Sequence, residues 1–269
     1  MSLIDLHIHT TVSDGSLSAT EVIALAKERG VSHLAWTDHD TTALAAAHAE
    51  EARHAGLAAI PGVELSAYDK TLGCKVHILG YGYTRTTAIE TLGAETLKKR
   101  HANSLDHIAR LNALGFEVPV EGVARLAGGC IYKQHILDYL LQSGQSRSLY
   151  GDVYWKIFKN GGPCDIDIDY PDARDAVRAV KEDGGWAVLA HPGQQDNFSL
   201  VSALVAVGLD GIESNHPSHG PKDITAAKDL ARRYGLFTTG GSDFHGRYER
   251  IPSTLGQYPA DGCSLIMFE

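Results

Sequence analysis

Short apolar runs alternate with amphipathic segments over both ends of the chain. Apolar runs of this length, bounded by glycine or polar turns, are typical of buried strands, whereas a 3.6-residue period indicates helices. The pattern predicts seven strands, at residues 3–6, 32–37, 57–60, 74–83, 186–190, 209–213 and 236–240. It predicts helices between them, at residues 19–29, 42–55, 171–182, 200–207 and 224–234. Alternation with short loops indicates an α/β protein with a parallel sheet or barrel.

Residues 86–169 break this alternation. Here the pattern predicts a long helix at 96–114 and shorter ones at 122–126 and 131–141, and Gly161-Gly162-Pro163 marks a break. We interpret 86–169 as a helical insert that caps the active site. The barrel itself would then consist of residues 1–85 and 170–269.

The composition excludes some classes of protein. The net charge of −9 over 269 residues argues against a surface for duplex nucleic acid, although it leaves room for a small basic pocket. No signal peptide and no apolar run of membrane-spanning length is visible. Four scattered cysteines, without a C-x-x-C pair, favour reduced thiols and a cytoplasmic protein with no membrane partner.

Two histidines follow the first predicted strand. His7 and His9 are two residues apart, so in an extended segment they point to the same side and could bind one ion together. Asp14 follows in a Ser-Asp-Gly turn, where its carboxylate can fold back over the strand end. Neutral imidazoles with carboxylates suit Zn, Mn or Fe.

Further potential ligands lie at or just after the ends of other strands. The full set is His7, His9, Asp14, His39, Glu64, His77, His191, Asp243 and His245. The carboxyl ends of strands in barrels and open α/β sheets are where active sites form. Burying so many ionisable groups without a compensating ion would be costly, so the sequence predicts a metal site.

The ordered motifs resemble those of the PHP (polymerase and histidinol phosphatase) family, which is related to the amidohydrolases. They are His7-Ile8-His9, Thr37-Asp38-His39, Gly62-Val63-Glu64, His77-Ile78-Leu79-Gly80-Tyr81, Ala190-His191-Pro192-Gly193 and Gly241-Ser242-Asp243-Phe244-His245. The resemblance spans nearly the whole chain and implies a distorted seven-stranded (β/α) barrel with two or three divalent metal ions.

The resemblance also implies how the ligands are grouped. His7, His9, Glu64 and Asp243 would hold one ion, and Glu64 would bridge to a second held by His77 and His191. Asp14, His39 and His245 would hold a third. A bridging carboxylate suits ions about 3.5–4 Å apart, which lower the pKa of a shared water and supply hydroxide as the nucleophile. The expected catalytic residues are Asp243, His191 and His245.

Positive ions with open positions favour a phosphate ester as substrate. The insert would complete the pocket with candidate phosphate contacts from Arg100, Lys133 and His135, joined by His219 and, as a further candidate, His216 from the barrel rim. Within the family the insert resembles that of small-molecule phosphoesterases, where Arg-Pro-His is common. Here the sequence is Lys133-Gln134-His135, and Lys lacks the bidentate fork of Arg, so nucleotide specificity does not transfer directly.

We therefore predict a metal-dependent phosphoesterase acting on a small phosphorylated metabolite, either a phosphomonoester or a five-membered cyclic phosphodiester. The alternatives are a nucleotide phosphatase for 3′,5′-bisphosphates or AMP-type substrates, and a histidinol-phosphate phosphatase. An exonuclease-like enzyme and a non-catalytic phosphate-binding module fit the sequence less well. Metal identity, substrate preference and oligomeric state stay open.

Other polar residues receive simpler interpretations. Either Asp38 or Asp40 is a candidate to orient a ligand imidazole, and Glu213 faces the pocket or pairs with a neighbour. Cys74 is assigned to the core, and Arg247 is a candidate substrate contact. Solvated positions are expected for the remaining residues, His48, His54, His101, His107, Asp165, Asp167 and Asp169.

Overall fold

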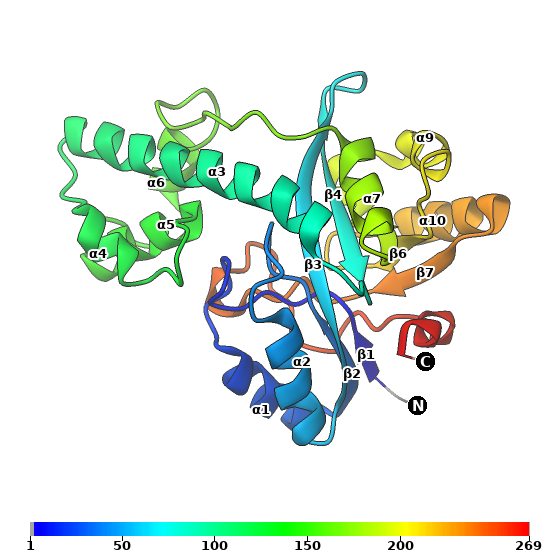
Figure 1. Ribbon diagram of the computed structural model, residues 1–269. Helices are drawn as coiled ribbons and strands as arrows, with labels where there is room; N and C mark the ends of the chain where they lie inside the picture. The colour runs from blue at the N-terminus through cyan, green and yellow to red at the C-terminus, as the bar shows by residue number, and fades with distance from the viewer. Residues whose placement is uncertain (1–2, 269) are drawn as a thin grey trace.

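The computed structural model describes residues 3–268 and contains one seven-stranded sheet in the order β1 to β7 (Figure 1). The strands are β1 (Leu3–Asp5), β2 (Val31–Trp36), β3 (Ala58–Asp69), β4 (Cys74–Tyr81), β5 (Trp186–Leu189), β6 (Gly211–Asn215) and β7 (Phe237–Gly240). All seven predicted strands are present, and the predicted α/β class is confirmed.

Strand β4 departs from the uniform parallel arrangement that the alternation suggested. It pairs antiparallel with both β3 and β5, whereas the other neighbouring strands are parallel. The connection from β3 to β4 is only four residues long, 70–73, which permits a hairpin but no parallel crossover. Because β4 runs the other way, its first half lies at the edge where the parallel strands end.

Hydrogen bonds beyond the ends of β1 and β7 join the first strand to the last. The Leu6 N–H donates to Gly240 O at 3.1 Å, and Ile8 forms a parallel bridge with Phe244. Asp5, which is fully buried, accepts from the Ser242 hydroxyl at 2.7 Å and from the Gly256 N–H at 2.8 Å. This seam closes the sheet into a distorted barrel.

The helices surround this sheet or extend from it (Figure 1). They are α1 (Ala19–Arg29), α2 (Ala45–His54), α3 (Thr87–Ala113), α4 (Val120–Ala124), α5 (Lys133–Gln142), α6 (Asp152–Ile157), α7 (Ala173–Glu182), α8 (Pro192–Gln195), α9 (Val201–Val205) and α10 (Pro221–Tyr234). Helix α1 has its predicted bounds, with the Ser18–Glu21 capping box and a left-handed Gly30. Helix α3 begins nine residues earlier than the predicted residue 96, and α6 was not predicted.

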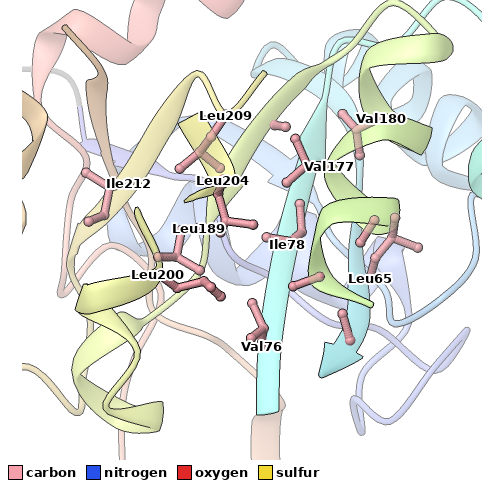
Figure 2. Packing of buried hydrophobic residues seen from close by; sticks show 14 of the residues in the cluster. Leu65, Val76, Ile78, Val177, Val180, Leu189, Leu200, Leu204, Leu209 and Ile212 are labelled. Carbon is pink, nitrogen blue, oxygen red and sulfur yellow. The ribbon is translucent and has the colours of Figure 1, made fainter. Parts of the chain in front are cut away.

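Of the four clusters of buried hydrophobic residues in the described part of the chain, two show how the sheet and the helical segment 86–169 are packed. The larger packs β3, β4 and β5 against α7 and α9, and Figure 2 shows Leu65, Ile78, Val177, Leu189 and Leu204 within it. Helices α3 to α6 share a separate core that includes Ile108, Leu111, Ile136, Leu140 and Phe158. A core of its own agrees with interpreting this segment as an insert. No helix among the described residues is both long and apolar enough to cross a membrane.

Two glycines bring this insert against the barrel loops. A Cβ on Gly93 of α3 would lie 2.2 Å from Asp40 O, and one on Gly128 would lie 2.0 Å from Thr11 O. Real Cβ atoms do not approach oxygen so closely, so only glycine permits these contacts. The insert is thereby held directly against the loops that carry Asp14 and His39.

Replacing Leu204 by alanine tests the packing of the larger core. Leu204 of α9 is fully buried, so Leu204→Ala should lower the free energy of unfolding by about 2–5 kcal/mol. Chemical denaturation followed by circular dichroism would measure this change. Leu72→Ala, at a site 45% exposed in the β3–β4 turn, is the control and should stay within about 0.5 kcal/mol. An equal loss in both variants would contradict the assignment of this core.

Candidate metal centre

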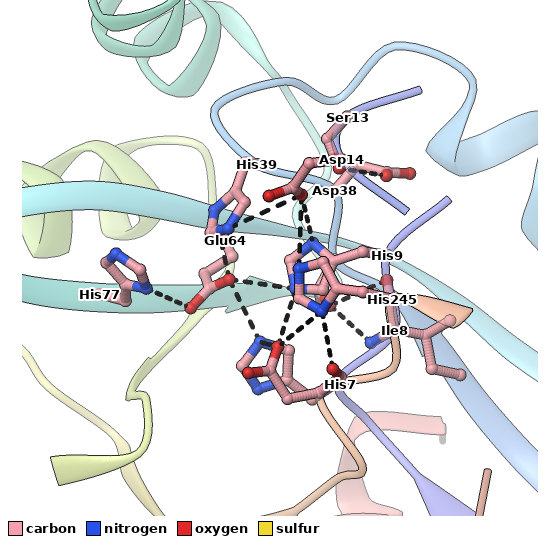
Figure 3. A network of polar contacts seen from close by, with 12 residues as sticks. His7, Ile8, His9, Ser13, Asp14, Asp38, His39, Glu64, His77 and His245 are labelled. Carbon is pink, nitrogen blue, oxygen red and sulfur yellow. Dashed lines mark hydrogen bonds and ion pairs between the residues drawn. The ribbon is translucent and has the colours of Figure 1, made fainter. Parts of the chain in front are cut away.

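The predicted ligands converge at one end of the barrel (Figure 3). His7 and His9 follow β1, and the Nε2 atoms of both rings lie 3.2 Å from Glu64 Oε2. They also lie 3.3 and 3.2 Å from Asp243 Oδ1. This is one of the ligand groups expected from the sequence, and its donor atoms come from β3 and from the segments that follow β1 and β7.

The Glu64 carboxylate reaches two sets of imidazoles with its two oxygens. Oε2 lies 3.2 Å from His39 Nδ1 as well as from His7 and His9. Oε1 lies 2.7 Å from His77 Nδ1 and 3.0 Å from His191 Nε2. One carboxylate at the junction of two donor sets is the arrangement that a bridging ligand between neighbouring ions requires.

A further donor set surrounds Asp14. Its Oδ1 lies 3.4 Å from His245 Nε2, 3.9 Å from His39 Nε2 and 3.8 Å from His9 Nδ1. The expected group of Asp14, His39 and His245 is therefore brought together, with His9 beside it.

The remaining expected group, Glu64, His77 and His191, meets at Glu64 Oε1, and each of the two histidines also has other neighbours. His77 gathers with Glu64 and His39, whereas His191 gathers with His216 and Asp243. The structure thus adds His216, which the sequence suggested only as a rim contact to substrate.

The unsatisfied donor atoms fit metal ions. His7 Nε2, both ring nitrogens of His9, Asp14 Oδ1 and His39 Nδ1 are buried without a hydrogen-bond partner. Buried polar atoms rarely lack a partner. Donors 3.2 Å apart but not aligned for hydrogen bonding are spaced like neighbouring corners around an ion bound at about 2.1 Å. The residue set of imidazoles and carboxylates suits Zn, Mn or Fe.

The carboxylates and imidazoles of the centre shift one another's pKa values. Burial disfavours charge on His7, but Glu64, Glu213 and Asp243 outweigh it and raise its pKa well above the usual value. Burial would raise the pKa of Glu64 and Asp243, yet the surrounding imidazoles hold both well below their usual values. The carboxylates therefore stay ionised, and they require positive charge close by, which bound cations would supply.

Backbone conformation aims two of these side chains. His191 has φ of 25° and Asp243 has φ of 49°, both in the left-handed region that non-glycine residues rarely occupy. Each such residue costs about 1–3 kcal/mol, and such strain is concentrated at functional sites. The turns after β5 and β7 thereby direct both side chains into the centre.

Glu213 supports two of the candidate ligands at once. Its Oε1 lies 3.0 Å from His7 Nδ1, and its Oε2 accepts from the His191 N–H at 2.8 Å. A carboxylate behind a ligand imidazole fixes the tautomer and the orientation of the ring. The pocket-facing alternative for Glu213 is therefore wrong: it is fully buried behind His7.

Asp38 and Asp40 do not orient an imidazole, so that expectation is wrong. Asp38 accepts from the Thr10 N–H at 2.8 Å and the Ser13 hydroxyl at 2.6 Å, which shapes the loop leading to Asp14. Asp40 accepts from the Ser66 N–H at 2.7 Å and from Arg100 at 2.9 Å. Both carboxylates organise loops around the centre.

Two adjoining chambers lie at the centre. The metal-side chamber is lined by His39, Glu64, His77, His191 and Asp243 and has a volume of 220 Å³ for water-sized molecules. The insert-side chamber has 300 Å³ and is lined by Arg100, Lys133, Lys159 and other insert residues. The two chambers adjoin one another, because they share the lining residues Asp14, His39, His77, Gln134, Tyr150, Gln194 and Arg250.

The predicted phosphate contacts separate into two kinds. Arg100 and Lys133 line the insert-side chamber, although Arg100 is also bonded to Asp40 and Ser66. His135 is fully buried below Tyr132 and lines neither chamber. His219 lines neither chamber, because its Nδ1 bonds Ser214 O and its Nε2 accepts from the Gly193 N–H. The structure thus gives His219 a role in holding the loop after His191.

Other residues also differ from their sequence interpretation. Arg247 bonds Asp138 and lines neither chamber. Cys74 is partly buried against the larger core, as predicted. Asp167 pairs with Lys75 at the insert-side chamber, and His107, expected to be solvated, is 1% exposed.

Sequence reasoning missed several residues of the chamber walls, among them Gln134, Tyr150, Gln194 and Arg250. Gln134 donates to Asp14 Oδ2 at 2.7 Å, and Tyr150 lines both chambers. Gln134 was seen only as a departure from Arg-Pro-His, and Tyr150 lies in a segment without a clear pattern.

Together, a seven-stranded α/β fold with a histidine- and carboxylate-rich centre at its strand ends defines a metal-dependent hydrolase. The sequence profile of the PHP domain matches residues 5–181, and the chain belongs to the PHP family.

Several characterised proteins are similar to this chain over most of its length. A phosphoribosyl 1,2-cyclic phosphate 1,2-diphosphodiesterase of Eggerthella lenta is 49% identical over 95% of this chain and 99% of its own. The 5′-3′ exoribonuclease Rnm of Escherichia coli is 34% identical, covering 90% of this chain and 84% of its own. A 3′,5′-nucleoside bisphosphate phosphatase of Chromobacterium violaceum is 33% identical, covering 91% and 88%.

A crystal structure from Bifidobacterium adolescentis, assigned as a metal-dependent phosphoesterase, superposes with a TM-score of 0.89. It is 29% identical and covers 98% of this chain and 94% of its own. The predictions of a PHP-type fold and of a metal-dependent phosphoric ester hydrolase are confirmed at the level of class.

His39→Ala tests the shared centre. His39 contacts both Glu64 and Asp14, so its loss should reduce turnover by at least about 100-fold and lower the metal content per chain. Phosphate-ester hydrolysis and elemental analysis would measure the two effects. His54→Ala, on the exposed face of α2, is the control and should match the unmutated protein. Full metal content and full turnover in His39→Ala would remove this residue from the centre.

Glu213→Gln tests the support of His7. Without the carboxylate, the His7 tautomer is no longer fixed, so metal affinity should fall by roughly 10- to 100-fold. Competition with a metallochromic chelator would measure that affinity independently of turnover. Glu182→Gln, at the exposed end of α7, serves as the control. Unaltered affinity in Glu213→Gln would show that His7 does not depend on Glu213.

Proposed function

We propose that this enzyme opens a five-membered cyclic phosphodiester of a phosphorylated sugar and then removes the resulting phosphomonoester. The observation that carries the proposal is the Glu64 carboxylate, whose two oxygens reach two different sets of imidazoles. Such an arrangement supports two or three divalent ions side by side. Both reactions are displacements at phosphorus, so one centre serves both.

The similar proteins support this choice of substrate class. The Eggerthella lenta relative, at 49% identity, is named for a phosphoribosyl 1,2-cyclic phosphate. It is aligned over 99% of its length, so the insert is included in the similarity. The compact two-chamber cavity also suits a small metabolite.

Divalent ions, when bound, supply Lewis acidity and lower the pKa of a coordinated water toward roughly 7. His7, His9, Asp14, His39, Glu64, His77, His191, Asp243 and His245 would hold them. Asp243 is the most exposed carboxylate of the first donor set, with 21% of its side chain accessible, and its Oδ2 lies 3.3 Å from His216 Nε2. We assign it to accept the proton of the attacking water and return it to the departing oxygen. His191 and His245 fix the position of the phosphorus opposite that oxygen.

A second candidate is hydrolysis of a nucleoside 3′,5′-bisphosphate or of the 5′ end of a short RNA. It is supported by the names of relatives at 33% and 34% identity and by the tyrosines that line the insert-side chamber, on which a base could stack. The replacement of Arg-Pro-His by Lys133-Gln134-His135 and the net charge of −9 favour the sugar phosphate.

A substrate panel with the metal-loaded protein distinguishes these candidates. It would contain ribose 1,2-cyclic phosphate with and without a 5-phosphate, a nucleoside 3′,5′-bisphosphate, a short RNA and histidinol phosphate. Phosphorus NMR separates ring opening from release of inorganic phosphate. We expect both steps on the cyclic sugar phosphates, with kcat/KM at least about tenfold above the other substrates.

Chelation should abolish both steps, and adding the metal back should restore them. Activity that survives verified metal removal would contradict the metal-dependent reaction. Preference for the nucleoside bisphosphate or the RNA would replace the proposed substrate by the second candidate.

A further inference from the structure

The insert-side chamber contains a group of cationic and polar side chains that the metal centre does not use. Lys133, Lys159 and His107 line this chamber, and none of them lines the metal-side chamber. They come from α5, from the segment after α6 and from α3, which are distant in sequence but meet in the core of the insert.

His107 is buried and unsatisfied. It is 1% exposed, and neither ring nitrogen makes a well-aligned hydrogen bond, although the backbone of Ile166 lies close to the ring. Its ring packs edge-on against Phe158 at 5.5 Å between centroids. A buried imidazole normally finds a partner, so a ring that lines a cavity without one indicates a ligand group that completes it.

Lys133 and Lys159 have no direct carboxylate partner within residues 3–268, although Asp165 and Asp167 partly offset the effect of burial on Lys133. Among residues 3–268, neither lysine forms an ion pair, whereas Lys75 in the same wall pairs with Asp167 and Arg100 pairs with Asp40. The Lys133 ammonium lies 5.8 Å from the Phe158 ring. Burial, together with the charges of Lys159 and Lys75, lowers the pKa of Lys133 to about 8. A bound anion would reverse this electrostatic penalty.

We propose that Lys133, Lys159 and His107 form a subsite for a second, non-reacting phosphate of the substrate. The inference rests on the proposed function and extends it, because it requires a substrate with two phosphate groups at its ends. The shared lining of the two chambers allows one molecule to span them. Lysine ammonium groups and an imidazole N–H supply donors for the terminal oxygens of a phosphomonoester.

The position of the subsite explains its selectivity. If the insert-side chamber held the phosphate on C5 of the sugar, the opposite end of the sugar would lie at the metal centre. This contact contributes binding energy at a distance from the reacting bonds, and it orients the substrate at the metal centre. A substrate without the second phosphate would leave the half-buried Lys133 without an anionic partner and the buried His107 without a ligand group.

The kinetic test compares ribose 1,2-cyclic phosphate with and without a 5-phosphate on the metal-loaded enzyme. The unmutated protein should show a higher kcat/KM for the 5-phosphorylated substrate. Lys133→Met should reduce the ratio of the two kcat/KM values by roughly 10- to 100-fold, the loss of a charge-assisted hydrogen bond to phosphate. Lys156→Met, at a lysine 74% exposed on α6, is the matched control and should keep the ratio. An unchanged ratio in Lys133→Met would overturn the subsite.

A binding measurement separates failure of the subsite from failure of the proposed function. Calorimetric titration of the metal-loaded protein with ribose 5-phosphate should give a dissociation constant at least tenfold weaker in Lys133→Met than in Lys156→Met. His107→Asn should weaken binding in the same direction. If Lys133→Met and His107→Asn weaken binding of ribose 5-phosphate but the enzyme cleaves no cyclic ester, the subsite is supported and the proposed function is wrong. If the cyclic esters are cleaved but binding is equal in all variants, the function stands and the subsite fails.

Discussion

The requirement to balance charge inside the barrel governs the structure of the centre. Asp14, Glu64 and Asp243 lie in one enclosed space with seven imidazoles, those of His7, His9, His39, His77, His191, His216 and His245. Removing such groups from water costs several kcal/mol per ion unless opposite charge and hydrogen bonds compensate it. The fold supplies the hydrogen bonds: Glu213 behind His7, Asp38 within the loop before Asp14, and Asp5 across the seam of the sheet. Cations at the centre would supply the rest.

Much of this centre could be predicted because it follows from local periodicity. Alternation of side chains in extended segments places His7 and His9 together, and the carboxyl ends of parallel strands bring His39, His191 and Asp243 to the same edge. Glu64 and His77 instead lie within β3 and β4. The α1 capping box is likewise local, and its bounds were predicted without error. These features require only short-range rules, so sequence patterns were sufficient.

The features that sequence reasoning missed depend on contacts between distant segments. In the sequence, His107 looks like a solvent-exposed residue of a helix. It is buried only because the other helices of the insert pack over it. His219 resembles a rim ligand until Gly193 and Ser214 occupy both its ring nitrogens. His135 follows Lys133 by two residues, which in a helix turns it away from the chamber. The grouping of His191 with His216 arises in the same way, from the meeting of two strands.

The seam between the first and last strands has a consequence for biosynthesis. His7 and His9 leave the ribosome early, but Asp243 and the Asp5 contacts to Ser242 and Gly256 require nearly the whole chain. At about 5–20 residues per second, the first histidines wait roughly 10 to 50 seconds for their partners. Until then a nascent chain can hold only incomplete donor sets. Complete donor sets would therefore form only late in synthesis, after β7 and the segment carrying Asp243 have been translated.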